Sequence, residues 1–235
     1  MNHILPLRDL SKFESGLWFT SVTAITASFL CTGTRDVLTL VASLIGVTAL
    51  IFVAKGYVIG QILTVVFAVF YGGISFFFHY YGEMITYLGM TAPIAIVTAI
   101  AWARHPFQSS REVEVRRITK KQLSLMLCLT LAVTVLFYFI LDTLGNANLL
   151  FSTVSVTTSF IASCFTFLRS PYYALGYSAN DIVLIVLWVL AALENPAYLP
   201  MVVCFLMFLA NDLYGFHHWQ HMQKVQAASV NTATR

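Results

Sequence analysis

Long apolar stretches recur along the whole chain and are separated by short polar turns. A transmembrane helix needs about 20 mostly apolar residues. Stretches of about that length cover residues 16–31, 37–54, 57–78, 83–103, 122–141, 148–168, 172–193 and 197–219. Within them, apolar residues do not alternate with polar ones as they do in barrel strands. The pattern therefore predicts an all-α integral membrane protein with eight transmembrane helices.

The composition agrees with this prediction. The chain has 235 residues, of which 59% are hydrophobic and 10% charged, and its mean hydropathy is +0.81. A soluble domain carries about 25% charged residues. The four cysteines each lie alone in an apolar stretch, without the spacing of a metal site or a disulfide framework. We expect no metal and no cofactor.

The first apolar stretch, 16–31, is short enough to be a signal sequence. Arg8 and Lys12 precede it, but Asp9 and Glu14 interrupt the basic lead, and no clean A-x-A cleavage site follows. We favour a retained, additional helix.

The basic residues predict the orientation. The segment ARHPFQSSREVEVRRITKK, residues 103–121, is here called the basic loop and should be cytoplasmic by the positive-inside rule. Alternating sides from there places 12 of the 13 Lys and Arg residues inside and only Arg35 outside. Both termini are then cytoplasmic, in a bacterial inner membrane. A charged cytoplasmic face explains the basic loop better than nucleic-acid binding does.

The two halves of the chain resemble each other weakly. Residues 52–72 match residues 166–190, with Tyr71 and Trp188 towards the helix ends, and the stretches ending at Trp102 and Trp219 also match. An even number of crossings separates the two tryptophans, so the repeats are parallel. Parallel repeats are a transporter architecture, with substrate held between them.

This repeat predicts a 3+1+3 core of two three-helix units. The expected organisation is an N-terminal segment 1–35 with the additional helix, a first repeat 36–104, a basic loop and linker helix 105–147, a second repeat 148–222 and a cytoplasmic tail 223–235.

Four motifs carry a resemblance to a known family. They are VAKGYVIGQIL, FFFHYYGEMITYL, AIAWARHP and, near the end, LYGFHHWQ. Together they resemble the PnuC family of vitamin transporters over about residues 37–222. The resemblance implies a full-length SWEET-like fold, commonly trimeric. It also implies inward facilitated diffusion of nicotinamide riboside, trapped by a cytoplasmic kinase; relatives carry thiamine, riboflavin or nucleosides.

The chain departs from the family at one motif. Members often show Trp-x-x-Trp followed four residues later by Asn. Here the two Trp positions hold Tyr173 and Gly176, and the Asn falls on Asn180. The first repeat has Tyr57, Gly60 and Thr64 at the corresponding positions. The resemblance therefore implies substrate contacts for Asn180 and Tyr173, and leaves open how the ligand stacks.

Two Ala-Asn-Asp sequences lie inside membrane stretches: Asn180–Asp181 and Asn211–Asp212. Helical rise places Asp181 roughly 13 Å and Asp212 roughly 10 Å from the cytoplasmic side, so the pairs can face one another. A carboxylate in hydrocarbon is costly, and these side chains should point at protein or water. They could line a substrate cavity and attract a cationic ring, bond helix to helix, or couple transport to protons.

Further candidates for substrate binding come from the third and seventh stretches. Gln61 and Thr64 can share a helix face, and Tyr71 and Trp188 could stack on a flat ring. Glu83 is expected at the outer face, more simply solvated than guarding an entrance, and Pro93 should kink its helix.

These observations predict a carrier of a small cationic vitamin or nucleoside, most simply nicotinamide riboside. The alternatives are another substrate of that kind, such as thiamine, riboflavin or a deoxynucleoside, a SWEET-type sugar carrier, or a membrane scaffold. No HExxH or GxSxG motif indicates an enzyme. The expected partners are the substrate, the lipid bilayer and further copies in a homotrimer, and no nucleic acid.

Overall fold

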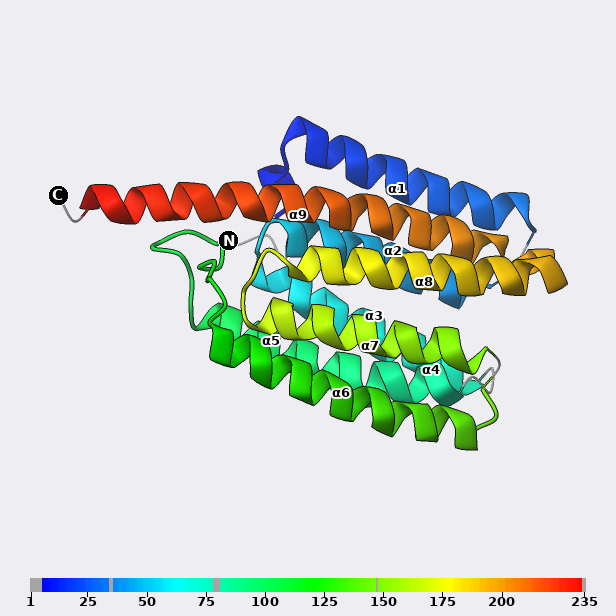
Figure 1. Cartoon of the computed structure of the whole chain (residues 1–235). Helices are drawn as coiled ribbons and strands as arrows, with labels where there is room; N and C mark the ends of the chain where they lie inside the picture. The colour runs from blue at the N-terminus through cyan, green and yellow to red at the C-terminus, as the bar shows by residue number, and fades with distance from the viewer. Residues whose placement is uncertain (1–5, 34–35, 78–80, 147, 234–235) are drawn as a thin grey trace.

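The computed structural model describes residues 6–33, 36–77, 81–146 and 148–233, and within them the chain is a bundle of roughly aligned helices (Figure 1). Its first half holds α1 (Lys12–Cys31), α2 (Val37–Ala54), α3 (Val58–Phe77), α4 (Tyr81–Ile85), η2 (Thr86–Thr91) and α5 (Ala92–Ala103), after a short η1 (Leu7–Asp9). Its second half holds α6 (Lys120–Thr143), α7 (Leu149–Phe167), α8 (Tyr173–Glu194), η3 (Pro196–Tyr198) and α9 (Leu199–Ala233).

The expectation of an all-α membrane protein is confirmed. Of the helices that the structure describes, seven are long and apolar enough to cross a membrane, and α1 falls outside this set. The remaining predicted crossing is therefore α1, which begins earlier than expected because Ser11 caps it. The Ser11 hydroxyl accepts from the Glu14 N–H, and the Glu14 carboxylate accepts from the Ser11 N–H.

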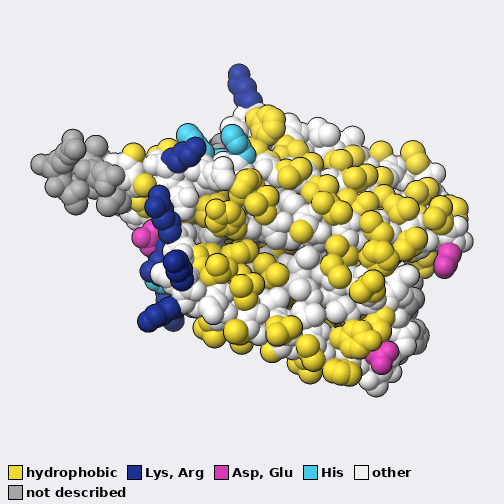
Figure 2. All heavy atoms as spheres, viewed as in Figure 1, with side chains coloured by type: hydrophobic (Ala, Val, Ile, Leu, Met, Phe, Trp, Pro, Cys, Tyr) yellow, Lys and Arg dark blue, Asp and Glu magenta, His cyan; other side chains and the backbone are white. Residues whose placement is uncertain are grey.

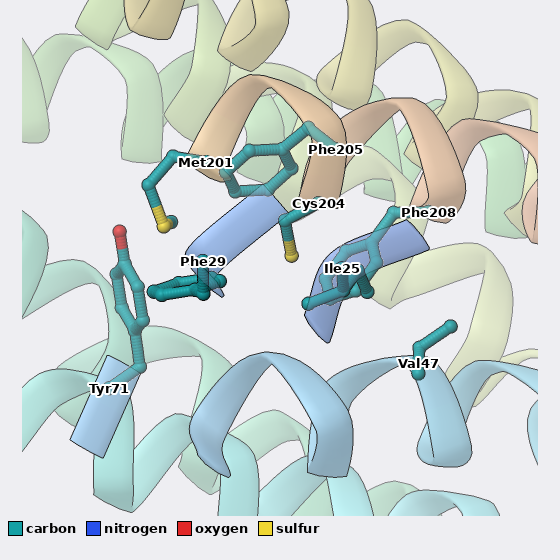
Figure 3. Packing of buried hydrophobic residues seen from close by; sticks show 8 residues of the cluster. All are labelled: Ile25, Phe29, Val47, Tyr71, Met201, Cys204, Phe205 and Phe208. Atoms are coloured by element: carbon teal, nitrogen blue, oxygen red, sulfur yellow. The ribbon is translucent and has the colours of Figure 1, made fainter. Parts of the chain in front are cut away.

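Helix α1 packs on α2 and α9. Ile25 and Phe29 from α1 meet Val47 of α2 and Phe205 of α9 in a buried apolar cluster, with Tyr71 of α3 at its edge (Figure 3). The additional helix is thus part of the hydrophobic core rather than a free N-terminal segment.

The span predicted at 83–103 is interrupted. A π-helical turn, η2, separates α4 from α5, and Pro93 stands at the start of α5. Proline lacks an N–H and clashes with the carbonyl four residues before it. The helix is therefore irregular just before Pro93, as a widened turn, and the kink expected at Pro93 stays a prediction.

The two predicted repeats have the same internal neighbours. In the first, α3 packs on α2 and α5; in the second, α8 packs on α7 and α9. The contacts between repeats also correspond, because α2 packs on α9 and α5 on α7. Helix α6 packs mainly on α7, and its Phe137 and Leu141 also join a buried cluster with Met90 of η2.

The first turn of each repeat ends in the same backbone conformation. Gly56 after α2 and Arg169 after α7 have positive φ angles of 69° and 58°. The N–H groups of Gly56 and Arg169 donate to the carbonyls of Val53 and Thr166. In each turn, the N–H group of the following residue donates to the carbonyl of the residue just before Val53 or Thr166. These are matching helix C-caps, although the sequences of the two turns differ.

Charge is unevenly distributed along the bundle. Figure 2 shows Lys and Arg gathered at the end where the basic loop and the C-terminal part of α9 lie, with an acidic side chain among them, whereas the charged side chains seen at the opposite end are acidic. Arg35, the one cation predicted outside, lies outside the described residues. Helix α9 continues to Ala233, beyond the predicted limit at 219, and in this part its Gln226 side chain bonds Val113 and Val115 of the basic loop.

Candidate functional site

A cavity of about 220 Å³ lies in the half of the bundle away from the basic loop. It is formed by residues from α3, α4, η2, the end of α6, α7 and α8. We call it the main cavity. It contains residues from both repeats, as expected for a transporter site.

Aromatic rings form much of its wall. Tyr71 and Tyr87 lie with ring centroids 4.6 Å apart, and Trp188 and Tyr198 lie 5.6 Å apart. Tyr71 belongs to the first repeat and Trp188 to the second. A flat heteroaromatic ligand could stack against such faces.

Asn180 provides an amide on the α8 side of the main cavity. Its Oδ1 accepts hydrogen bonds from the hydroxyls of Ser155 and Thr158 on α7, both at 3.0 Å. These two bonds hold the amide plane in place. The Nδ2 group makes no hydrogen bond within the described part of the chain and is available as a donor.

Glu83 is the acid of the main cavity. Its carboxylate accepts a hydrogen bond from the Ser75 hydroxyl at 3.5 Å, and Tyr71 lines the same cavity. No Lys, Arg or His is among the described residues that line the cavity. The main cavity is therefore suited to a cationic or neutral aromatic solute and unsuited to an anion.

The opposite end of the bundle is closed by packed aromatic rings. Trp102, Trp219 and Tyr173 are fully buried there, in one apolar cluster with Val113. The Tyr173 ring lies 4.9 Å from that of Trp219. This cluster, here called the inner seal, separates the main cavity from the basic loop.

The basic loop lies across the inner seal and bonds to both repeats. The Val113 N–H donates to the Gly56 carbonyl in the first repeat, and the Arg116 N–H donates to the Arg169 carbonyl in the second, both at 3.0 Å. Arg169 also pairs with Glu114 at 3.1 Å. Burial lowers the pKa of the Arg169 guanidinium, and the nearby Glu114 opposes that shift.

Three of the residues expected to bind substrate line the main cavity: Asn180, Tyr71 and Trp188. Tyr173 lies in the inner seal instead. Gln61 is buried in α3, and the Thr64 hydroxyl donates to the Gly60 carbonyl of its own helix.

The remaining three expected residues lie between helices. Asn211 donates to the Ser21 hydroxyl of α1 at 3.0 Å and to the Met207 carbonyl. Asp181 of α8 and Asp212 of α9 are buried, as their depth in the helices predicts, and Asp181 Oδ2 has no hydrogen-bond partner among the described residues.

Sequence reasoning gave too little weight to Glu83 and Tyr87. Glu83 was expected to be solvated at the outer face, yet it lies in the cavity wall. The π-helical turn of η2 begins at Thr86, after Glu83 and the end of α4, and contains Tyr87. The nearby Pro93 was the available signal, because a kinked helix turns side chains towards a different neighbour.

Comparison with known proteins adds to this geometry. A family model described as nicotinamide mononucleotide transporter matches residues 36–221. The chain belongs to this family. Like its PnuC members, it is a membrane transporter and not an enzyme.

Two curated PnuC relatives are described as nicotinamide riboside transporters. The one from Neisseria mucosa is 28% identical over 78% of this chain and 72% of its own length. The one from Haemophilus influenzae is 23% identical over 80% of each chain. These relatives and the seven apolar helices make this PnuC family member a multi-pass inner-membrane protein.

A solved structure supports the fold. A crystal structure described as that of the vitamin B3 transporter PnuC superposes with a TM-score of 0.79, covering 92% of this chain and 94% of that one at 24% identity. The additional helix α1 lies before the region of the PnuC family match.

Proposed function

We propose that the protein takes up nicotinamide riboside, bound in the main cavity, by facilitated diffusion. The observation that carries this proposal is the chemistry of the cavity wall: one carboxylate, an amide donor and several aromatic rings, without a described cation. Nicotinamide riboside has a permanently cationic aromatic ring and uncharged ribose hydroxyls. Glu83 attracts the ring, Tyr71 and Trp188 stack on it, and Asn180 bonds a hydroxyl or the carboxamide.

The same chemistry distinguishes the riboside from its phosphate ester. A mononucleotide adds a phosphate of about −2 charge, which would approach Glu83 with no lysine or arginine of the described wall to receive it. Phosphorylation in the cytoplasm therefore prevents return of the product. Trapping of this kind makes uptake down a gradient effectively one-way, without an ion gradient.

Transport also requires the inner seal to open. In the structure the main cavity lies away from the basic loop, and the rings of the inner seal block the route to that side. We propose that the two three-helix units move against each other, carrying Trp102 and Trp219 apart. The basic loop, bonded to both units, limits that movement. We also propose a cytoplasmic location for both termini and a homotrimer.

Purified protein tests the substrate. Calorimetry should show binding of nicotinamide riboside and much weaker binding of nicotinamide mononucleotide. Binding of thiamine or riboflavin with none of the riboside would assign another vitamin, and binding of a sugar alone would assign a sugar carrier. A scaffold would bind none of them.

Proton coupling is the second candidate mechanism, and the two buried acids Asp181 and Asp212, inside the membrane-spanning part of α8 and α9, favour it. Uptake into proteoliposomes distinguishes the two. Facilitated diffusion continues after an ionophore collapses the proton gradient. Loss of uptake under that condition would show that the acid pair couples transport to protons.

A further inference from the structure

A second cavity, of about 250 Å³, adjoins the main one at the end of the bundle opposite the basic loop. It lies where α2 begins and where α8 ends and η3 leads into α9. Asp36 and Asn195 belong to its wall, together with Phe29 near the end of α1. We call it the outer chamber.

The outer chamber and the main cavity share part of their walls. Tyr71, Glu83, Trp188 and Tyr198 line both. A solute that reaches the main cavity through the outer chamber must pass these four side chains. They therefore form the boundary between two adjacent spaces, with Glu83 accessible from either.

The outer chamber has the chemistry of a cation site. Two carboxylates, Asp36 and Glu83, lie among the rings of Phe29, Tyr71 and Trp188, and no Lys, Arg or His is among its described lining residues. Asp36 accepts hydrogen bonds from the Thr39 N–H at 3.0 Å and from the Thr39 hydroxyl. These donors are neutral, and Asp36 forms no ion pair with any residue that the structure describes. Carboxylates beside aromatic faces favour a cationic ring.

Part of this wall comes from outside the family match. Phe29 belongs to α1, which precedes residue 36, and its side chain is 5% exposed. The additional helix is held in place well away from the outer chamber, by the buried pair of Glu14 and Lys55. Helix α1 therefore contributes a fixed aromatic surface to the outer chamber.

We propose that the outer chamber is an access site that binds the cationic aromatic ring of the substrate before it passes Tyr71 and Trp188 into the main cavity. This inference rests on the proposed function. Asp36 raises the local concentration of the cation, Phe29 provides a ring face, and Glu83 receives the charge at the boundary. The outer chamber is thus a second subsite that binds the same class of ligand as the main cavity.

The test uses the full chain in proteoliposomes, with uptake of nicotinamide riboside and of its reduced form, whose dihydropyridine ring is neutral and similar in size. Asp36→Asn removes the charge and keeps the helix cap, because Asn and Asp cap helices equally well. We expect KM for the cationic form to rise about two- to fivefold while KM for the neutral form and the maximal rate stay constant. Calorimetric affinity at the main cavity should change less.

Two further variants complete the design. Phe29→Ala should also raise KM for the cation, and Glu194→Gln, at an exposed acid of the same end of the bundle, should change nothing. Unchanged KM in both Asp36→Asn and Phe29→Ala would overturn the proposal, as would equal shifts for the charged and neutral substrates. Absence of any riboside uptake by the unaltered protein would instead contradict the proposed function.

Discussion

Trp102 and Trp219 make equivalent hydrogen bonds, each donated from one repeat to the other. The indole N–H of Trp102, at the end of the first repeat, donates to the Thr166 carbonyl in the second at 3.0 Å. That of Trp219, at the end of the second repeat, donates to the Val53 carbonyl in the first, also at 3.0 Å. Their rings lie 5.4 Å apart. Each acceptor is the next-to-last residue of its helix, α7 or α2.

This reciprocity predicts equal effects of equivalent mutations. Trp102→Phe and Trp219→Phe each remove one donor, while the Thr166 and Val53 carbonyls keep the backbone N–H bonds of Arg169 and Gly56, so each loss costs about 0.5–1.5 kcal/mol. Both variants should lower the thermal unfolding midpoint in detergent by similar amounts. Trp18→Phe, which loses a part-buried bond to Thr48, is the control and should have a smaller effect. A large loss from only one of the two would contradict the symmetry.

Substitutions of Asn180 and Asn211 should have different effects, the first on substrate affinity and the second on stability. Asn180→Ala removes a donor from the main cavity and should weaken riboside binding several-fold, since one hydrogen bond contributes about 1 kcal/mol. Asn211→Ala breaks the bond to Ser21 on α1, outside the walls of both cavities, and should lower stability with little change in affinity. Calorimetry and thermal unfolding on the same samples measure both. Unchanged affinity in Asn180→Ala would make that residue a helix-packing amide.

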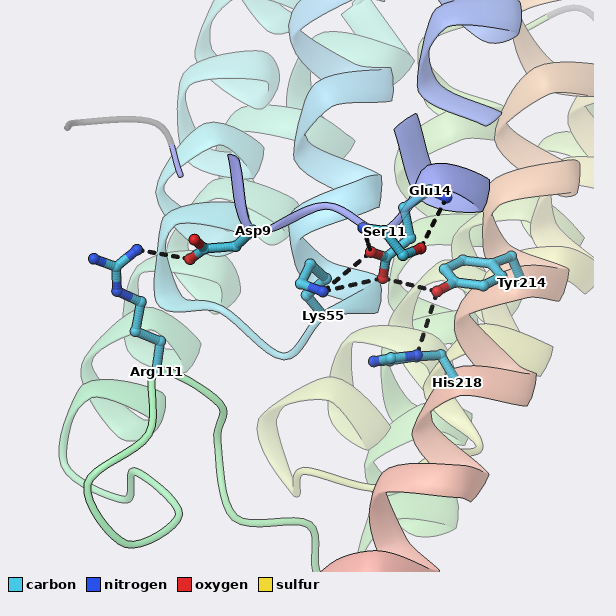
Figure 4. A network of polar contacts seen from close by, with 7 residues as sticks. All are labelled: Asp9, Ser11, Glu14, Lys55, Arg111, Tyr214 and His218. Carbon is cyan, nitrogen blue, oxygen red and sulfur yellow. Dashed lines mark hydrogen bonds and ion pairs between the residues drawn. The ribbon is translucent and has the colours of Figure 1, made fainter. Parts of the chain in front are cut away.

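The ion pair of Glu14 and Lys55 should contribute far more than the pair of Asp9 and Arg111. Figure 4 shows both, with Tyr214 and His218 extending the first one. Lys55 lies 3.1 Å from Glu14, whose side chain is only 1% exposed, and the Tyr214 hydroxyl donates to the same carboxylate at 2.8 Å.

Breaking a buried pair by removing one partner costs about 3–5 kcal/mol, so Glu14→Gln should destabilise the protein strongly and loosen α1. The pair of Asp9 and Arg111 is exposed, and Asp9→Asn should lower stability by no more than about 1 kcal/mol. Urea unfolding followed by Trp fluorescence gives both values. Equal effects would mean that burial does not determine the strength of these pairs.

Gly176 allows α8 to pack closely on α7. A Cβ placed there would lie 2.8 Å from the Cα of Ala162, a backbone atom that cannot move away alone. Gly176→Ala should therefore force the helices apart, lower the unfolding midpoint by several degrees and disturb the bonds that α7 makes to Asn180. Overpacking of this kind costs about 1–3 kcal/mol.

Gly73→Ala is the matched control for that substitution. A Cβ at Gly73 meets no atom within 4 Å, so alanine should be tolerated in α3 and even stabilise the helix slightly. Destabilisation by Gly73→Ala comparable to that of Gly176→Ala would show that the close approach to Ala162 is not the cause.

Which of the candidate site residues meet could not be predicted from the pattern alone. Asn180 and Asp181 are adjacent in sequence, yet Asn180 bonds α7 and lines the main cavity, while Asp181 is buried outside the described lining of that cavity. Helical rise predicted the common depth of the two acids but not the face each presents. Glu83 was placed near a solvated end because nothing in its own stretch indicates the walls that α3 and α8 build around it.

By itself, the sequence determined the features that depend on local composition. Apolar length determined the helices, the basic loop determined the uneven charge, Pro93 indicated an irregular helix, and Trp102 and Trp219 marked the ends of the two repeats. Tertiary structure alone decided how those helices rotate against one another. The rotation of each helix about its axis places Tyr173 in the inner seal, Asn211 in the contact with α1, and Glu83 in the wall of the main cavity. The physical reason is that burial between helices depends on side chains contributed by segments more than a hundred residues apart, such as Val53 and Trp219.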